Sequence, residues 1–159
     1  IDYLGRSRKY LAVNCQINAG NGGYNLITKY PRANFVSLND KEIRLALQEK
    51  KGDFNEIVKR LSTERNIGQI NITHGKFGIE YYEYGKFYKS PAFIKEPLDT
   101  IGSGDAVFAL TSLLAYNNAG PELIPFLGNC IGGLATRIIG NRSPVDITQL
   151  KKFVSYMLK

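Results

Sequence analysis

Short apolar runs typical of buried strands alternate along this chain with segments of helical periodicity, and this alternation restricts the possible folds more than any other feature. The strand-like runs lie at residues 9–14, 34–39 and 68–75. Between the second and third runs, segment 40–50 carries apolar residues at helical spacing, and segment 53–61 does so behind Asp53, a favoured helix cap. Strands separated by helices predict a parallel sheet with helices on its faces, so we assign the chain to the α/β class.

The remaining segments add a hairpin and further helices. We expect a helix at 24–30, stopped by Pro31 and preceded by a turn-rich segment at 16–23. The aromatic segment 78–93 is typical of a hairpin that turns at Gly85-Lys86. Additional helices are expected at 105–117, 121–139 and 146–158.

The net charge is +7, from 21 Lys and Arg against 14 Asp and Glu. This charge favours an anionic partner, but the basic residues are scattered, and a solvated basic surface explains them more simply. No apolar run of 18 residues indicates a transmembrane helix, and the first residues lack the apolar region of a signal peptide. Cys15 and Cys130 are therefore expected to be reduced thiols in a cytoplasmic protein, although a disulfide stays open.

The segment Asp99–Asp105, DTIGSGD, indicates chemistry more specifically than any other part of the chain. Gly102 and Gly104 bracket Ser103 directly before a helix-forming run. Glycine lets the backbone approach a ligand, and the first amides of a helix are unpartnered and carry partial positive charge. We therefore predict an anion site here, with Asp105 beside it to take a proton from an attacking hydroxyl. The alternative is a glycine-rich turn in which Asp105 only caps the helix.

The same segment, LDTIGSGDAVFA, resembles the DTxGAGD signature of the ribokinase-like carbohydrate kinases, also called the PfkB family, with Ser103 in place of the usual alanine. The resemblance implies a three-layer ribokinase-like fold, ATP as the phosphoryl donor and Asp105 as the general base. It implies an anion hole formed by the amides of Gly102, Ser103 and Gly104. Many members hold a monovalent cation such as K⁺ beside this loop, which assigns Asp99 and Ile101 to that cation. Gly140 and Ser143 fall where the cation loop usually closes.

A second match lies upstream, at the end of the strand predicted at 34–39. Asn39-Asp40-Lys41-Glu42 resembles the family's NxxE motif, whose Asn and Glu organise Mg²⁺ and phosphate, often through water. The resemblance assigns Glu42 to Mg²⁺ through water and Asn39 to the nucleotide, and a hydrated cation held by few carboxylates suits Mg²⁺. Without the resemblance, the same residues are a helix cap followed by a surface glutamate.

Two further segments resemble nucleotide-binding parts of the family. Segment 73–78 resembles the turn at a strand end that borders the phosphates, and segment 129–135 resembles the helix of small residues that flanks the adenine. The resemblance assigns to the nucleotide Thr73, Gly75, Gly78, Asn129 and Gly132. Close helix packing explains the small residues of 129–135 equally well. His74 is the only histidine, and the family gives its position no catalytic role.

The matches run in family order from about residue 9 to residue 158, with a spacing that resembles the heptose-phosphate kinases. Family members are longer, and their first half carries the lid and most sugar-binding residues. Residues 1–159 are therefore expected to be the nucleotide-binding and catalytic portion, without that N-terminal half. The resemblance implies ATP, a sugar or sugar phosphate and the missing half as partners. It leaves a homodimer open and favours neither a membrane nor nucleic acid.

Other classes of function fit less well. A dinucleotide-binding Rossmann motif needs a third glycine where Val107 stands, and no Walker GxxxxGK[ST] motif occurs. A catalytically silent nucleotide-binding or scaffold module derived from such a kinase stays open, although the presence of Asp105 favours an enzyme. The aromatic hairpin admits a single-stranded nucleic-acid binder, but packing on helices explains it as well. We expect the isolated chain to bind nucleotide weakly and to show little kinase turnover.

Overall fold

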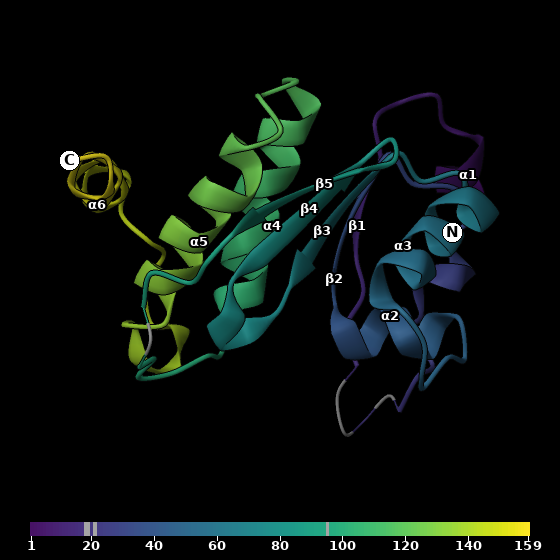
Figure 1. Cartoon of the computed structure of the whole chain (residues 1–159), viewed down its shortest axis with the longest axis horizontal. Helices are drawn as coiled ribbons and strands as arrows, with labels where there is room; N and C mark the ends of the chain where they lie inside the picture. The colour runs from purple at the N-terminus through teal and green to yellow at the C-terminus, as the bar shows by residue number, and fades with distance from the viewer. Residues whose placement is uncertain (18–19, 21, 95) are drawn as a thin grey trace. The chain divides into compact units, whose positions relative to one another are not determined.

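The computed structural model describes residues 1–17, 20, 22–94 and 96–159. In chain order its elements are α1 (Asp2–Arg6), β1 (Ala12–Asn14), η1 (Ile27–Lys29), β2 (Phe35–Asn39), α2 (Asp40–Ala46), α3 (Phe54–Arg65), β3 (Gln69–Thr73), η2 (Gly75–Phe77), β4 (Ile79–Glu83), β5 (Lys86–Ser90), α4 (Ser103–Tyr116), α5 (Leu123–Ala135), η3 (Ile139–Asn141) and α6 (Ile147–Met157). The five strands form one sheet in the order β1-β2-β3-β4-β5, which confirms the α/β class (Figure 1). Of the turn-rich segment predicted at 16–23, residues 18, 19 and 21 lie outside the described residues.

The chain divides into two compact units. The first unit comprises Ile1–Thr73 and Tyr81–Phe87, and the second unit comprises His74–Glu80 and Tyr88–Lys159. The predicted hairpin of β4 and β5 contributes residues to both units. Its turn lies at Tyr84-Gly85, one residue earlier than predicted, because Lys86 already belongs to β5.

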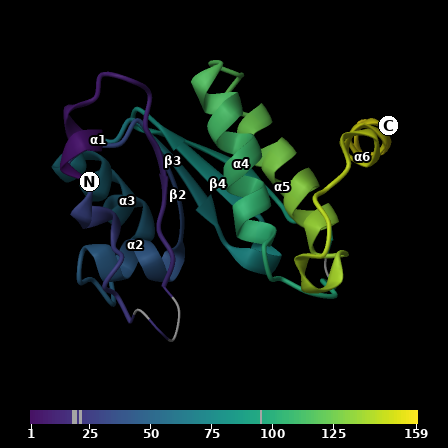
Figure 2. The same cartoon turned by 180° about the vertical axis from the view of Figure 1, so that it is seen from behind.

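Parallel pairing in the first unit places aligned side chains of β1, β2 and β3 on common faces of the sheet. Val13 aligns with Val36, and Val36 with Ile70, so these apolar side chains share one face. Ser37 aligns with Asn71 on the opposite face, where the Asn71 side chain donates to Ser37 Oγ at 3.1 Å. The apolar face belongs to a core that includes, from α2 and α3, Ile43, Ile57, Val58 and Leu61. Both views show α2 and α3 next to these strands (Figures 1 and 2).

Two of the predicted helices are shorter in the structure than in the sequence analysis. The helix expected at 24–30 is reduced to the single 3-10 turn η1, because Leu26 before it and Tyr30 after it have extended backbones. Helix α2 ends at Ala46 rather than near residue 50, because Gln48 adopts a φ of +56°, which interrupts a right-handed helix.

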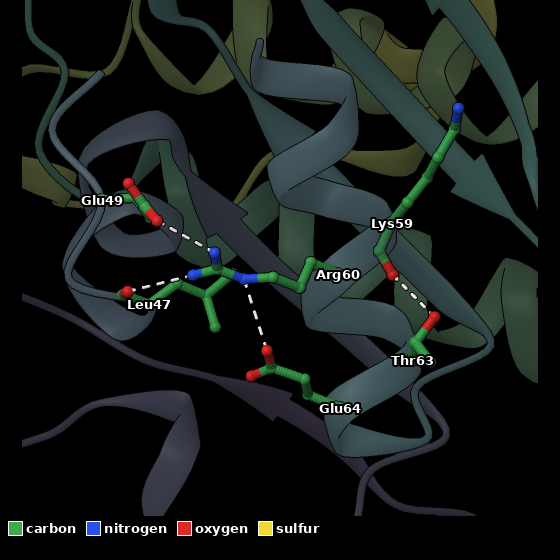
Figure 3. A network of polar contacts seen from close by, with 6 residues as sticks. All are labelled: Leu47, Glu49, Lys59, Arg60, Thr63 and Glu64. Carbon is green, nitrogen blue, oxygen red and sulfur yellow. Dashed lines mark hydrogen bonds and ion pairs between the residues drawn. The ribbon is translucent and has the colours of Figure 1, made fainter. Parts of the chain in front are cut away.

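Arg60 of α3 holds the connection that follows α2. Its guanidinium donates to Glu49 Oε1 at 2.9 Å and to the carbonyl of Leu47 at 3.2 Å, and it pairs with Glu64 Oε1 at 3.3 Å (Figure 3). The Leu47 carbonyl lies just beyond α2, where helical carbonyls lack intrahelical partners. Arg60 therefore links the end of one helix to the middle of the next.

Helices α4 and α5 lie side by side in the second unit in both views (Figures 1 and 2). An aromatic cluster joins α5 and α6, because the Phe93 ring meets Phe126 edge-on at 5.5 Å and Phe153 at 6.5 Å. Leu150 of α6 is buried, as the helical pattern of 146–158 predicts.

In the part of the chain that the structure describes, no helix combines the length and the apolar character needed to cross a membrane. Cys15 and Cys130 are both free and buried, which agrees with the prediction of reduced thiols. Burial raises the pKa of each thiol to about 11, so both are protonated at neutral pH.

Candidate functional site

The carboxyl ends of β2 and β3 lie next to each other in the first unit. Asn39 and Thr73, the last residues of these strands, are aligned partners in the parallel ladder. Ligands of open α/β sheets bind beyond the carboxyl ends of parallel strands. The pairing thus brings together two residues that the sequence assigns to the nucleotide.

Glu42 is a buried carboxylate with 7% of its surface exposed, and it connects the end of β2 to the segment at Ile17. Asn39 Oδ1 accepts from the Glu42 amide at 3.0 Å, and Glu42 Oε2 accepts from the Asn39 amide at 2.8 Å, which is a reciprocal capping box. Glu42 Oε1 accepts from the Ile17 amide at 3.3 Å. Burial raises the pKa of Glu42, and these hydrogen bonds oppose the rise.

The same hydrogen bonds limit how Glu42 can hold a metal ion. Each carboxylate oxygen already accepts one backbone amide, which leaves it further acceptor capacity but no free choice of orientation. A Mg²⁺ ion usually keeps several of its waters, so the arrangement fits contact through water better than direct ligation.

A second carboxylate closes a loop in the second unit. Asp99 Oδ1 accepts from the Ile101 amide at 2.9 Å and Oδ2 from the Gly140 amide at 2.7 Å, while the Asp99 amide donates to the Thr136 carbonyl at 3.0 Å. The backbone hydrogen bonds hold the pKa of Asp99 below its usual value. The residues assigned to a monovalent cation thus lie in one closed loop. The carboxylate and carbonyl oxygens of such a loop are ligands that suit a hard cation.

The loop before α4 has a left-handed backbone at Gly102, a conformation that favours glycine. Gly102 adopts a φ of +76°, and a Cβ added there would lie 2.6 Å from Asn141 Cγ. The N-cap residue Gly102 has no side chain to cap α4, and the Ser103 amide donates to the Thr100 carbonyl at 3.3 Å. Asp105 is exposed in the first turn of the helix. The helix dipole therefore favours an anion at an end where a carboxylate is also accessible.

The turn 74–78 connects β3 to β4 and contains two glycines of different character. Gly75 has a φ of +58° and a Cβ there would meet nothing within 4 Å, whereas Gly78 has a φ of +107° and a Cβ there would lie 2.2 Å from the Ser90 carbonyl oxygen. Gly78 is thus a turn residue fixed by close backbone contact, and its assignment to the nucleotide stays a prediction. Gly75 and Phe77 are exposed at the tip of the turn.

Asn129 and Gly132 have clear packing roles in α5. The Asn129 side chain is buried and donates to the Ser90 carbonyl at 2.7 Å. A Cβ at Gly132 would lie 2.8 Å from Val107 Cγ2 of α4, so glycine permits the close approach of the two helices. These contacts favour helix packing as the reason for both residues, and nucleotide contact by either residue stays a prediction.

The predicted residues fall into two groups. The first unit brings together Asn39, Glu42 and Thr73, and the second unit contains all the others. Within the second unit, the bond from Asp99 to Gly140 and the packing of Asn141 on Gly102 join the segments 99–102 and 140–141. Asn141 was not predicted as a site residue, and only its position next to Gly140 could have indicated a role.

Comparison with curated proteins finds two relatives of the same description. The chain is 29% identical to the bifunctional protein HldE of Koribacter versatilis over 126 residues, which is 77% of this chain and 26% of that protein. It is 28% identical to the bifunctional protein HldE of Campylobacter concisus over 117 residues, which is 72% of this chain and 25% of that protein. The chain therefore spans about a quarter of the length of these relatives.

Solved sugar kinases share the fold. Phosphofructokinase-2 from Escherichia coli, solved in complex with potassium, superposes with a TM-score of 0.76 at 16% identity, over 94% of this chain and 48% of that one. The 2-dehydro-3-deoxygluconokinase of Thermotoga maritima gives a TM-score of 0.74 at 13% identity, over 92% of this chain and 50% of that one. These likenesses confirm the ribokinase-like fold, and the chain spans about half the length of each structure.

The sequence profile of the pfkB family carbohydrate kinases matches residues 25–146, which include β2 to α5 and both segments joined around Asp99. This match covers more than half of the chain and confirms the resemblance carried by DTIGSGD. The protein therefore belongs to the pfkB family of carbohydrate kinases.

Proposed function

We propose that this chain is the nucleotide-binding and catalytic portion of an ATP-dependent kinase that phosphorylates a hydroxyl group of a sugar or sugar phosphate. The observation that carries the proposal is the start of α4, where the left-handed N-cap residue Gly102 has no side chain to cap the helix and Asp105 is exposed in the first turn. The N-terminal half, with the lid and most of the sugar-binding residues, would come from outside residues 1–159.

The proposed reaction is an in-line transfer of the γ-phosphoryl group. The acceptor hydroxyl oxygen forms a bond to the γ-phosphorus, the bond to the bridging oxygen of ADP breaks, and Asp105 takes the hydroxyl proton. The amides of Gly102, Ser103 and Gly104 stabilise the charge on the transferring group. For the Ser103 amide, this role requires release from the Thr100 carbonyl, a contact of 3.3 Å.

Two cations would assist in this proposal. Mg²⁺ neutralises phosphate charge when bound, and Glu42 would hold it through water while Asn39 and Thr73 face the nucleotide. A monovalent cation such as K⁺ would take oxygen ligands from Asp99 and Ile101, and would support the loop without touching substrate. The turn with Gly75 and Gly78 would border the phosphates, and α5, with Asn129 and Gly132, would flank the adenine.

The acceptor class follows from the sequence resemblance to heptose-phosphate kinases, so a heptose phosphate is the first substrate to assay. Phosphofructokinase-2 from Escherichia coli, which shares the fold, has been solved with fructose-6-phosphate, a sugar phosphate.

The test is Asp105→Asn in the complete kinase. General-base catalysis contributes about 10²–10⁴-fold, so kcat should fall by about that factor while the ATP affinity changes little. Asp53→Asn is the matched control, because it makes the same change at the cap of α3, where asparagine caps equally well. A parallel loss of ATP affinity and kcat would reassign Asp105 to binding. Unchanged kcat would exclude Asp105 as the general base, whereas an absence of turnover in the unaltered kinase would favour a catalytically silent nucleotide-binding module.

The isolated chain offers a second test. It should bind ATP weakly and transfer phosphate to a sugar at a negligible rate, because the lid and most sugar contacts would be absent. Efficient sugar phosphorylation by residues 1–159 alone would contradict the proposed division of the kinase.

A further inference from the structure

Glu80 is a buried carboxylate that the proposed reaction does not use. It lies in β4 with only 5% of its side chain exposed, and burial of an unpaired carboxylate is costly. His74 Nε2 lies 3.4 Å from Glu80 Oε2, and Lys89 Nζ lies 2.9 Å from Glu80 Oε1. Burial favours the neutral acid, but His74 and Lys89 outweigh it and hold the pKa of Glu80 below its usual value. Glu80 therefore stays ionised between two cationic or hydrogen-bonding partners.

His74 and Gly78 are the first and last residues of the turn 74–78 between β3 and β4, and we call them its two stems. The His74 amide donates to the Gly78 carbonyl at 2.8 Å, and the His74 carbonyl accepts from the Phe77 amide at 3.2 Å. The His74 backbone thus closes the turn, while its side chain reaches Glu80 on the following strand. A contact at this side chain restrains the orientation of the whole stem.

The other stem is held independently. Gly78 passes so close to the end of β5 that a Cβ there would lie 2.2 Å from the Ser90 carbonyl oxygen and 2.7 Å from the Ala92 nitrogen. The Ser90 carbonyl also accepts from the buried Asn129 side chain at 2.7 Å, which ties this strand end to α5. The tip between the stems, by contrast, is exposed, and Gly75 has open space around its Cα.

We propose that Glu80 is a positioning residue for nucleotide binding, which acts through His74 to hold the turn 74–78 in the conformation that receives the phosphates. This inference rests on the proposed function, because it assigns the turn to the nucleotide. Glu80 itself does not touch ATP. It lowers the cost of ordering the tip when the phosphates bind, so its loss weakens binding and leaves the phosphoryl-transfer step unchanged.

The isolated chain provides a direct readout because His74 is its only histidine. Chain labelled with ¹³C and ¹⁵N histidine gives one set of imidazole resonances, which can be followed during a titration with Mg·ATP. In the unaltered chain, those resonances should shift along the same curve as the binding isotherm. Glu80→Gln keeps the size of the side chain but removes its charge, and should weaken ATP binding about tenfold.

A double-mutant comparison of Glu80 and His74 distinguishes a positioning role from a general loss of structure. If Glu80 acts through His74, then His74→Ala should weaken ATP binding by a similar factor, and the double variant should be no weaker than either single one. His74→Gln, whose amide can donate to Glu80 from a similar place, should retain most of the affinity. Urea midpoints identify any variant that is unfolded, and His74→Ala, with a partly exposed side chain, carries the test if Glu80→Gln does not fold.

In the complete kinase, Glu80→Gln should raise the KM for ATP about tenfold and leave kcat unchanged. The inference is overturned if ATP binds the unaltered chain normally but Glu80→Gln and His74→Ala have no effect, or if their effects add. If ATP does not bind the unaltered chain or the complete kinase at all, the proposed function fails, and the inference fails with it.

Discussion

Replacing each glycine of the turn 74–78 by alanine tests the local backbone directly, because the two positions differ in backbone conformation and in the space around the added Cβ. At Gly75, an alanine would suffer only the strain of a left-handed φ of +58°, since no atom lies within 4 Å of the added Cβ. This strain costs about 1–2 kcal/mol. At Gly78, the φ of +107° and ψ of −150° fall in a region that is essentially restricted to glycine, which costs about 1–3 kcal/mol.

The overlap at position 78 adds to that strain. The Cβ of Gly78→Ala would lie 2.2 Å from Ser90 O and 2.7 Å from Ala92 N, and backbone atoms cannot move away by changing a rotamer. Overpacking of this kind costs about 1–3 kcal/mol. We therefore expect about 4 kcal/mol for Gly78→Ala against about 1.5 kcal/mol for Gly75→Ala. Any gain from the stiffer unfolded chain is common to both variants and cancels in the comparison.

Urea denaturation followed by circular dichroism measures the difference. The midpoint should fall much further for Gly78→Ala, with an unchanged slope for both variants. Thermal denaturation should show losses of roughly 12 °C and roughly 5 °C for a chain of this size. Equal losses would mean that the strand end at Ser90 does not approach Gly78 as closely as the structure indicates, and that Gly78 is not held rigidly.

The remaining predictions concern the thiols and two carboxylates. With the pKa of both buried thiols raised to about 11, roughly 0.1% of each cysteine side chain is in the thiolate form at pH 8. A thiol reagent should therefore modify the native chain far more slowly than the chain in urea. Similar rates would contradict the burial of the two thiols. Because the pKa of Asp99 is lowered from 3.8, its hydrogen bonds from the Ile101 and Gly140 amides persist as the pH falls to that value and are lost as the pH passes through the lower folded pKa. The NMR shifts of both amide protons should therefore titrate together below pH 3.8, and separate midpoints would contradict a shared carboxylate. Because the pKa of Glu42 is raised from 4.5, the folded state disfavours its ionised form. The stability of the chain relative to Glu42→Gln, measured by urea midpoints, should therefore decline as the pH rises from 4.5 through the folded pKa. A relative gain in stability with rising pH would contradict the raised pKa.

Local patterns allowed the parts of the site that depend on neighbouring residues to be predicted. Asn39 and Glu42 are three residues apart, and this spacing is that of a capping box, which the structure contains. Asn39 and Thr73 end two apolar runs, and parallel pairing then aligns them without further information. Gly102, before a helix-forming run, similarly indicated a special backbone conformation.

Contacts between distant residues could not be predicted in this way. Nothing near Asp99 indicates that its second oxygen accepts from Gly140, 41 residues later. The pattern of β4 likewise could not show that Glu80 is buried, because its partners His74 and Lys89 come from the elements before and after that strand. The short helix α1 was also missed, since five residues are too few for a helical period to be recognised.

The hairpin of β4 and β5 gives residues to both compact units, and this has a practical consequence for dissecting the protein. Neither unit is a single uninterrupted stretch of sequence, since the backbone passes from one to the other after Thr73, after Glu80 and after Phe87. A cut after Thr73 separates Tyr81–Phe87 from the rest of the first unit, and a cut after Phe87 separates His74–Glu80 from the rest of the second unit. A cut after Glu80 divides both units. Fragment-complementation or circular-permutation experiments should therefore place new termini outside residues 74–87.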